Sequence, residues 1–301
     1  MSWTRVVVLA GTLVACGGSK PDAPLPTEGA DSAGAQQPRA LFVGIDGMRP
    51  DAMRAADTPH LDRLRAEGTW TWSAQTQLTG ATSSAPGWTS IFTGVEVEVH
   101  GVRANGVYDT YDRSHPTFAQ VARQTLGHPT MAVAHWPEVL SAIHPPEAFD
   151  ESLLASDDGV TDTLATAIGG AVAHLYVAHL DDVDHAGHAS GFSVDNPDYI
   201  AAIEAQDARL GALLAAIDAR PATEDWLVVV TTDHGGAGTN HGDQNADCQV
   251  IPFVVWGGGA PARELVEADA VSHLDAFPTI LTHLGATPDQ LGAASGTSRV
   301  P

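Results

Sequence analysis

Three continuous apolar runs along the chain each end in acidic or histidine residues. They cover residues 41–45, 175–178 and 226–230 and are rich in valine and leucine. An apolar run without polar alternation is typical of a strand buried on both faces, as in a parallel sheet. We therefore expect three strands of a largely parallel sheet, with the polar residues at their carboxyl ends.

Helical spacing appears between and after these runs. Apolar residues recur at three- and four-residue intervals over 58–68, 197–219 and 275–284. Alternating strands and helices predict the α/β fold class, here a single domain with a mostly parallel central sheet and helices on both faces. In such folds the functional residues gather at the carboxyl ends of the strands.

The N-terminal segment resembles an export signal. Arg5 precedes an apolar run of about ten residues, which is too short to span a bilayer. The run ends in Leu-Val-Ala-Cys, which resembles the lipobox of bacterial lipoproteins, where the cysteine is acylated after cleavage. We expect residues 1–16 to be a lipoprotein signal peptide, with a lipid on Cys16 anchoring the chain at the bacterial cell envelope. The alternative is a buried N-terminal strand with an incidental cysteine.

Composition sets the remaining boundaries. Residues 17–38 are rich in glycine, proline, alanine and serine, which predicts a flexible linker. Residues 286–301 have a similar composition and predict a loose C-terminal tail. The expected globular domain is therefore 39–285.

The charge balance narrows the function classes. The 301 residues include 14 Lys and Arg against 37 Asp and Glu, a net charge of −23. This excess argues against non-specific nucleic-acid binding and against polybasic attachment to anionic lipid. A negatively charged substrate would need local positive charge, and bound metal ions could supply it. The 14 histidines fit that interpretation.

Six candidate metal ligands follow the apolar runs. Asp184 and His188 are four residues apart, which lets both reach one ion from a single helical face. The full set is Asp46, Asp184, His188, Asp233, His234 and His241. Three carboxylates and three imidazoles suit two zinc ions, or other divalent metals, and a two-metal site promotes in-line displacement at phosphorus.

Each candidate also has a structural explanation when it is taken alone. Asp46-Gly47 could form a turn or cap a helix. Asp184 to His188 could be a solvated acidic loop, and His241 could be a surface histidine. A pair of ionisable groups such as Asp233-His234, directly after a buried strand, is harder to explain without a partner or a metal.

The segment 82–94 is rich in hydroxyl groups and could supply a nucleophile. A hydroxyl at the N-terminus of a helix is favoured by the helix dipole, and a metal would lower its pKa further. Some of these hydroxyls are also good N-cap residues.

Taken in order along the chain, these motifs resemble the alkaline phosphatase superfamily, closest to its type I phosphodiesterase/nucleotide pyrophosphatase branch. The matching motifs are Asp46-Gly47, Thr58 to Leu64, Ser84 to Gly94, His100-Gly101, Asp184 to His188, Asp233 to Gly235, His241-Gly242 and Asp275 to Thr279. The resemblance implies an alkaline phosphatase-like catalytic domain over 39–285 and places Ser84 at the nucleophile, where threonine is usual.

The resemblance also implies roles for the site residues. One zinc would be held by Asp184, His188 and His241, and the other by Asp46, Asp233, His234 and the Ser84 oxygen. Asn105 matches an asparagine that contacts the phosphoryl group. Ser84 would attack phosphorus to form a phosphoseryl enzyme, which water then hydrolyses.

The implied substrate is a small phosphate ester, most naturally a phosphodiester or nucleotide pyrophosphate. A phosphomonoesterase and a phosphonate or sulfate ester hydrolase remain as alternatives, although neither cysteine lies in the Cys-x-Pro-x-Arg segment of sulfatases. A non-catalytic binding lipoprotein is a further alternative. Tryptophans that could stack a base are Trp70, Trp72, Trp88 and Trp136.

Overall fold

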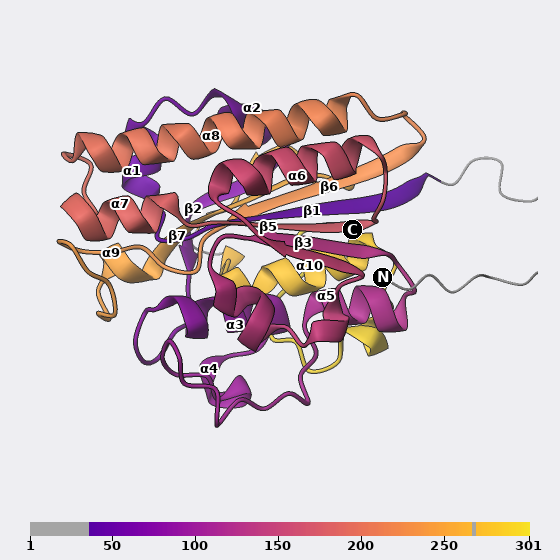
Figure 1. Cartoon of the computed structure of the whole chain (residues 1–301), viewed down its shortest axis with the longest axis horizontal. Coiled ribbons are helices and arrows are strands. Elements are labelled where there is room, and N and C mark those ends of the chain that lie inside the picture. The colour runs from indigo at the N-terminus through magenta and orange to yellow at the C-terminus, as the bar shows by residue number, and fades with distance from the viewer. Residues whose placement is uncertain (1–35, 267–268) are drawn as a thin grey trace, which may run out of the picture. The chain divides into compact units, whose positions relative to one another are not determined.

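The computed structural model describes residues 36–266 and 269–301, whose centre is an eight-stranded sheet (Figure 1). The strands lie in the order β4-β3-β5-β1-β6-β7-β2-β8. Their bounds are β1 Gln37–Ile45, β2 Thr69–Gln75, β3 Thr130–Ala134, β4 Glu151–Leu154, β5 Leu175–Leu180, β6 Glu224–Thr231, β7 Val250–Gly257 and β8 Arg263–Glu264. The three predicted strands are β1, β5 and β6, and they are neighbours at the centre of the sheet.

The sheet is mostly parallel, as predicted. β1 pairs in parallel with β5 on one side and with β6 on the other, and β3 pairs in parallel with β4 and β5. β7 runs antiparallel to both β6 and β2. The apolar run at 250–255 resembles the parallel strands in composition, so the sequence does not reveal its direction.

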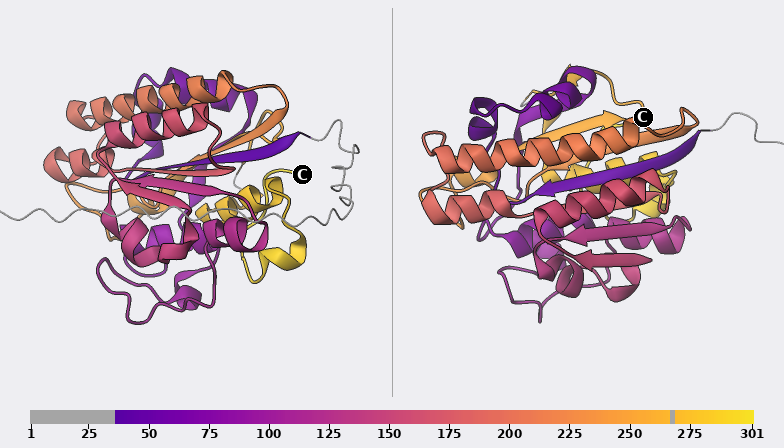
Figure 2. Two further views of the ribbon diagram at one scale, coloured as in Figure 1. Left: turned by 45° about the vertical axis from the view of Figure 1, so that its right-hand side comes forward. Right: turned by 45° about the horizontal axis from the view of Figure 1, so that its top comes forward.

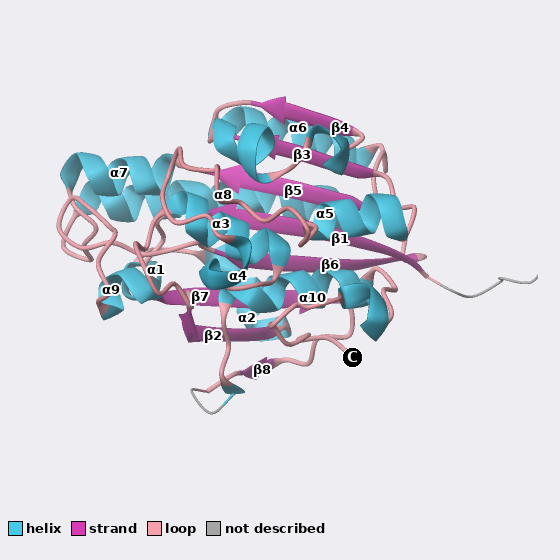
Figure 3. Cartoon of the chain, turned by 90° about the horizontal axis from the view of Figure 1, so that it is seen from below, coloured by secondary structure: helices cyan, strands magenta, loops and turns pink. Residues whose placement is uncertain are grey.

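Helices cover both faces of the sheet, which confirms the predicted fold class (Figures 2 and 3). Leu41 and Val43 of β1 pack with apolar residues of α6 and α8, whereas Phe42 packs with those of α3 and α10. Side chains alternate between the faces of a strand, so one continuous apolar run serves both layers. The helices are α1 Pro50–Ala55, α2 Pro59–Glu67, α3 Ser84–Thr93, α4 Val97–His100, α5 Phe118–Gln120, α6 Asp157–Gly169, α7 Asp182–Ser190, α8 Pro197–Asp218, α9 Ala246–Gln249 and α10 Ala276–His283.

The predicted helices match α2, α8 and α10 within one or two residues at each end. Proline occupies the first helical position of α2 and of α8, where its missing N–H would be unpaired in any case. The side chain of Asn196 also accepts a hydrogen bond from the backbone N–H of Asp198 and caps α8.

The domain extends beyond both expected boundaries. Gln37 and Pro38 belong to β1, although the composition of 17–38 predicts a linker. At the other end, the tail 286–301 is held against the domain rather than loose. Arg299 Nε donates to Asp275 Oδ2 at 2.8 Å, and the backbone N–H of Ser295 donates to the carbonyl of Gly94 at 2.8 Å. The amino-acid composition of this segment, which is rich in small residues, does not predict such long-range contacts.

The predicted signal peptide 1–16, its Cys16 and most of the predicted linker lie outside the described residues. Within the described part of the chain, no helix combines the length and the apolar character that crossing a membrane requires.

Candidate active site

The carboxyl ends of the three central strands bring the candidate ligands together. Asp46 follows β1, Asp233 follows β6 after one residue, and Asp184 lies in α7, the helix that follows β5. Pairing of Ile45 with Leu180 and of Gly44 with Thr231 aligns these strand ends. Parallel strands therefore deliver residues from three distant parts of the sequence to one edge of the sheet.

Asp46, Asp233 and His234 form one buried group. One ligating atom from each lies within 4.8 Å of the others. His234 Nε2 is 3.5 Å from Asp46 Oδ1 and 3.3 Å from Asp233 Oδ2. Ser84 Oγ lies 3.4 Å from the same His234 nitrogen. The four residues assigned by resemblance to one ion thus converge on a common point.

Asp184, His188 and His241 form an adjoining group. Asp184 Oδ2 is 3.3 Å from His188 Nε2, and its Oδ1 is 3.9 Å from His241 Nε2. The rings of His234 and His241 stack with their centroids 3.9 Å apart, which joins the two groups. The structure therefore brings all six predicted ligands into one continuous cluster.

Backbone carbonyls orient the three histidines. The Nδ1 atoms of His188, His234 and His241 lie 3.0, 2.7 and 2.8 Å from the carbonyl oxygens of Thr239, Gly235 and Thr82. A carbonyl only accepts, so each Nδ1 carries the proton and each Nε2 keeps a free lone pair. This arrangement is typical of histidines that bind a metal through Nε2.

The crowding of buried carboxyl groups in the cluster shifts their pKa values, and a nearby positive charge would stabilise their ionised forms. Burial, followed by the charges of Asp46 and Asp181, raises the pKa of Asp184 to about 9. Burial and the same kind of repulsion also raise the pKa of Asp233 well above its usual value. Burial, followed by the nearby His241, lowers the pKa of His234 to about 3, which keeps the imidazole in its neutral, ligating form.

Unpaired carboxylate oxygens test whether divalent ions fit this site. Asp46 Oδ1, Asp184 Oδ1 and Asp233 Oδ2 are buried and have no hydrogen-bond donor among the described residues. An unpaired buried carboxylate oxygen is costly unless it coordinates a metal. The donor types, their burial and these three free oxygens all fit divalent cations of the zinc type.

Two glycines allow the backbone to approach these ligands. Gly47 has φ +68°, and an added Cβ would lie 2.7 Å from Asp184 Oδ1. A Cβ on Gly87 of α3 would lie 2.8 Å from the Asp233 Cβ. A side chain at either position would force the ligands apart.

Ser84 and Asn105 lie beside each other at the N-terminus of α3. Ser84 is the first residue of the helix and is 6% exposed. Asn105 lies in the turn between the bridged residues Ala104 and Val107, and its Oδ1 accepts a hydrogen bond from the backbone N–H of Ala85 at 2.8 Å. Asn105 is therefore hydrogen-bonded to the residue that follows the proposed nucleophile.

Two residues outside the predicted ligand set hold Asp46 in place, and one of them, Trp88, is predicted from the sequence only as a base-stacking candidate. Trp88 Nε1 donates to Asp46 Oδ2 at 2.9 Å, and His179 Nε2 lies 3.5 Å from the same oxygen. Burial disfavours the charged form of Asp46, but the nearby His179 and His234 imidazoles and the Trp88 hydrogen bond outweigh it, so the pKa of Asp46 is lowered. An imidazole within the apolar strand β5 was the available signal for His179.

The four tryptophans do not form a base-stacking pair at this site. Trp88 is fully buried, and Trp136 packs near His179 with ring centroids 6.4 Å apart. Trp70 and Trp72 lie together on β2, where the Arg65 guanidinium covers both rings.

Sequence comparisons relate the chain to phosphodiesterases. A model of the family described as type I phosphodiesterase / nucleotide pyrophosphatase matches residues 40–250. Bis(5'-adenosyl)-triphosphatase ENPP4 of Bos taurus is 26% identical over 232 residues, 68% of this chain and 49% of that protein. Ectonucleotide pyrophosphatase/phosphodiesterase family member 5 of Homo sapiens is 26% identical over 221 residues, 66% of this chain and 45% of that protein. The chain spans about half the length of these curated relatives.

Solved structures agree on the fold. Murine ectonucleotide pyrophosphatase/phosphodiesterase 5 in complex with AMP has a TM-score of 0.66 at 16% identity, covering 83% of this chain and 96% of that one. A 2-O GAG sulfatase has a TM-score of 0.70 at 14% identity, covering 87% and 73%. The phosphonate monoester hydrolase of Silicibacter pomeroyi has a TM-score of 0.66 at 16% identity, covering 87% and 76%.

Proposed function

The chain belongs to the type I phosphodiesterase / nucleotide pyrophosphatase family of the alkaline phosphatase superfamily, and from this premise we propose that it is a two-zinc hydrolase of phosphate esters with Ser84 as its nucleophile. The observation that carries the proposal is the convergence of Ser84 Oγ with six ligating side chains, of which Asp46, Asp184, Asp233 and His234 are buried. Asp46, Asp233 and His234 would hold one ion beside Ser84. Asp184, His188 and His241 would hold the other.

The protein's own residues prepare Ser84 for attack. Ser84 begins α3, so its hydroxyl lies where the helix dipole favours developing negative charge. Bound divalent ions would supply charge that stabilises the phosphoryl oxygens. Asn105, next to Ser84, is placed to donate a hydrogen bond from its amide nitrogen to a phosphoryl oxygen, because its Oδ1 is already engaged by Ala85. Attack of the Ser84 oxygen on phosphorus would expel the leaving alcohol or phosphate and leave the rest of the phosphate ester on the serine. Water would then hydrolyse this serine ester and restore the Ser84 hydroxyl.

The proposed substrates are small phosphodiesters or nucleotide pyrophosphates. The family name and the printed activities of the relatives favour cleavage of nucleotide phosphoanhydrides or diesters. The acidic surface, with a net charge of −23, agrees with a small substrate rather than a nucleic-acid polymer.

Turnover of a chromogenic phosphodiester by the zinc-loaded protein tests the proposal. We expect Ser84→Ala to lower kcat by at least about 10³-fold, because the attacking oxygen is removed. Ser83→Ala, which removes the neighbouring hydroxyl, is the matched control and should keep most of the activity. Equal activity of Ser84→Ala and unmodified protein would rule out the nucleophile assignment. Parallel assays with a phosphomonoester and a phosphonate ester separate the alternative substrate classes.

We also propose that the chain is exported and anchored through a lipid on Cys16. The lipobox-like sequence before Cys16 supports this proposal. In a bacterial host, the unmodified chain should incorporate labelled fatty acid and sediment with membranes, and Cys16→Ser should do neither. Labelling of both proteins would contradict the assignment to Cys16.

A further inference from the structure

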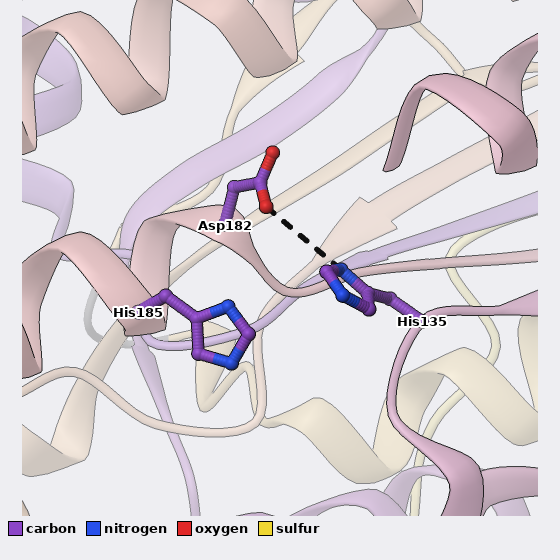
Figure 4. A group of neighbouring side chains, drawn as sticks. All are labelled: His135, Asp182 and His185. Carbon is purple, nitrogen blue, oxygen red and sulfur yellow. Dashed lines mark ion pairs between the residues drawn. The ribbon is translucent and has the colours of Figure 1, made fainter. Parts of the chain in front are cut away.

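A second group of ligating side chains, His135, Asp182 and His185, lies near the carboxyl ends of β3 and β5. One ligating atom from each lies within 4.8 Å of the others. His135 directly follows β3, and Asp182 and His185 belong to the first turn of α7. Figure 4 shows the three side chains directed toward a common space. None of them is among the six proposed catalytic ligands.

A fully buried carboxylate organises this group. Asp157 accepts hydrogen bonds from His135 Nδ1 at 2.8 Å and from the backbone N–H of Asp182 at 2.9 Å. Since an ionised carboxylate only accepts hydrogen bonds, Nδ1 of His135 carries the proton and Nε2 is free to bind a cation. A carboxylate behind a histidine is the arrangement that orients histidines in metal sites.

An arginine fixes the position of the Asp182 carboxylate. Its Oδ2 lies 3.1 Å from Arg209 Nη1, whereas its Oδ1 lies 3.8 Å from His135 Nδ1. The ion pair with Arg209 therefore holds one oxygen of Asp182, and the other oxygen lies on the side that faces the His135 ring.

The local charge favours a cation. Three carboxylates, those of Asp157, Asp181 and Asp182, surround the two histidines, and Arg209 supplies one compensating charge. Asp181 Oδ2 lies 3.4 Å from His185 Nε2. An oxygen of Asp181 also lies within 4.8 Å of carboxylate oxygens of Asp46 and Asp184, so Asp181 connects this group to the proposed active site.

We propose that His135, Asp182 and His185 bind a third divalent transition-metal ion. Two imidazoles and a carboxylate form a zinc ligand set that leaves a fourth position for water. Tetrahedral zinc places its ligating atoms about 3.4 Å apart. The side chain of His185 is 58% exposed and can rotate to close the remaining distance. The ion would lie one carboxylate away from the catalytic pair, where its charge acts on an anionic substrate.

Zinc content per chain tests the proposal. The full chain is stripped with a chelator, dialysed against buffered free zinc and analysed by mass spectrometry. We expect His185→Ala and His135→Ala each to bind one ion fewer than the unmodified protein. His115→Ala is the matched control, because His115 lies 3.9 Å from the Asp112 carboxylate but belongs to none of the ligating groups in the described part of the chain.

The difference of one ion, rather than the total, decides the outcome. His135 contacts buried Asp157, so His135→Ala could fail to fold. In that case the zinc content of His185→Ala, a change at an exposed side chain, tests the proposal. Asp157→Asn should weaken the affinity for this ion by about 10–100-fold while the other ions are retained. Equal zinc content in the unmodified and His185→Ala proteins would overturn the proposal, and so would loss of an ion in His115→Ala. Neither result bears on Ser84, whose variant tests the catalytic proposal separately.

Discussion

Two residues outside the proposed ligand set, Trp88 and His179, fix the position of Asp46. Trp88 and His179 both address Oδ2 of this carboxylate, which leaves Oδ1 free for a cation. The convergence of the six proposed ligands could be predicted because they lie in short motifs near strand ends. The Trp88–Asp46 contact could not be predicted, because the two residues are 42 positions apart and a tryptophan in an apolar helix is expected to pack in the hydrophobic core.

Replacing Trp88 by phenylalanine tests this contact. We expect Trp88→Phe to lower metal affinity or kcat by about 10–100-fold, because the ring remains apolar but the donor to Asp46 is lost. Zinc titration and steady-state kinetics measure the effect, and thermal unfolding checks the fold. Trp72→Phe, a change on β2 away from Asp46, should leave both quantities unaltered. If the two variants behave alike, Trp88 acts through packing only.

At the scale of elements, periodicity predicts more than composition does. The helices α2, α8 and α10 and the strands β1, β5 and β6 follow from apolar spacing, because local burial determines it. The antiparallel direction of β7 and the packed tail do not follow, because both depend on contacts between distant segments. Arg299 and Asp275 illustrate this, since their side chains are only 9% and 3% exposed and pair across the C-terminal region.

This ion pair should stabilise the C-terminal tail against α10. Arg299→Ala leaves the buried Asp275 carboxylate without its cation, so we expect a loss of about 3–5 kcal/mol in the free energy of unfolding. Arg63→Ala removes an ion pair with Asp218 in which the arginine side chain is 34% exposed and the aspartate side chain 46% exposed. Its loss should lower the free energy of unfolding by at most about 1 kcal/mol. Urea unfolding of both variants provides the comparison, and equal costs would show that the tail contributes little.

At the scale of the whole molecule, acidic charge and metal binding are linked. The net charge is −23, and part of it lies in buried carboxylates at one edge of the sheet. Repulsion among Asp46, Asp184 and Asp233 opposes folding in the absence of cations. Ions that bind only the folded chain would therefore stabilise it in proportion to the logarithm of their concentration.

Metal removal should consequently lower the thermal stability of the whole domain. At free zinc of about 100 times the dissociation constant, one bound ion contributes about 2.7 kcal/mol, so chelation should lower the Tm by several degrees. Readdition of zinc should restore it, as measured by calorimetry. An Asp184→Asn, Asp233→Asn protein should respond less to zinc, because two ligands are lost together with much of the repulsion. A Tm that chelator does not change in the unmodified protein would show that the carboxylate cluster is stable without a cation.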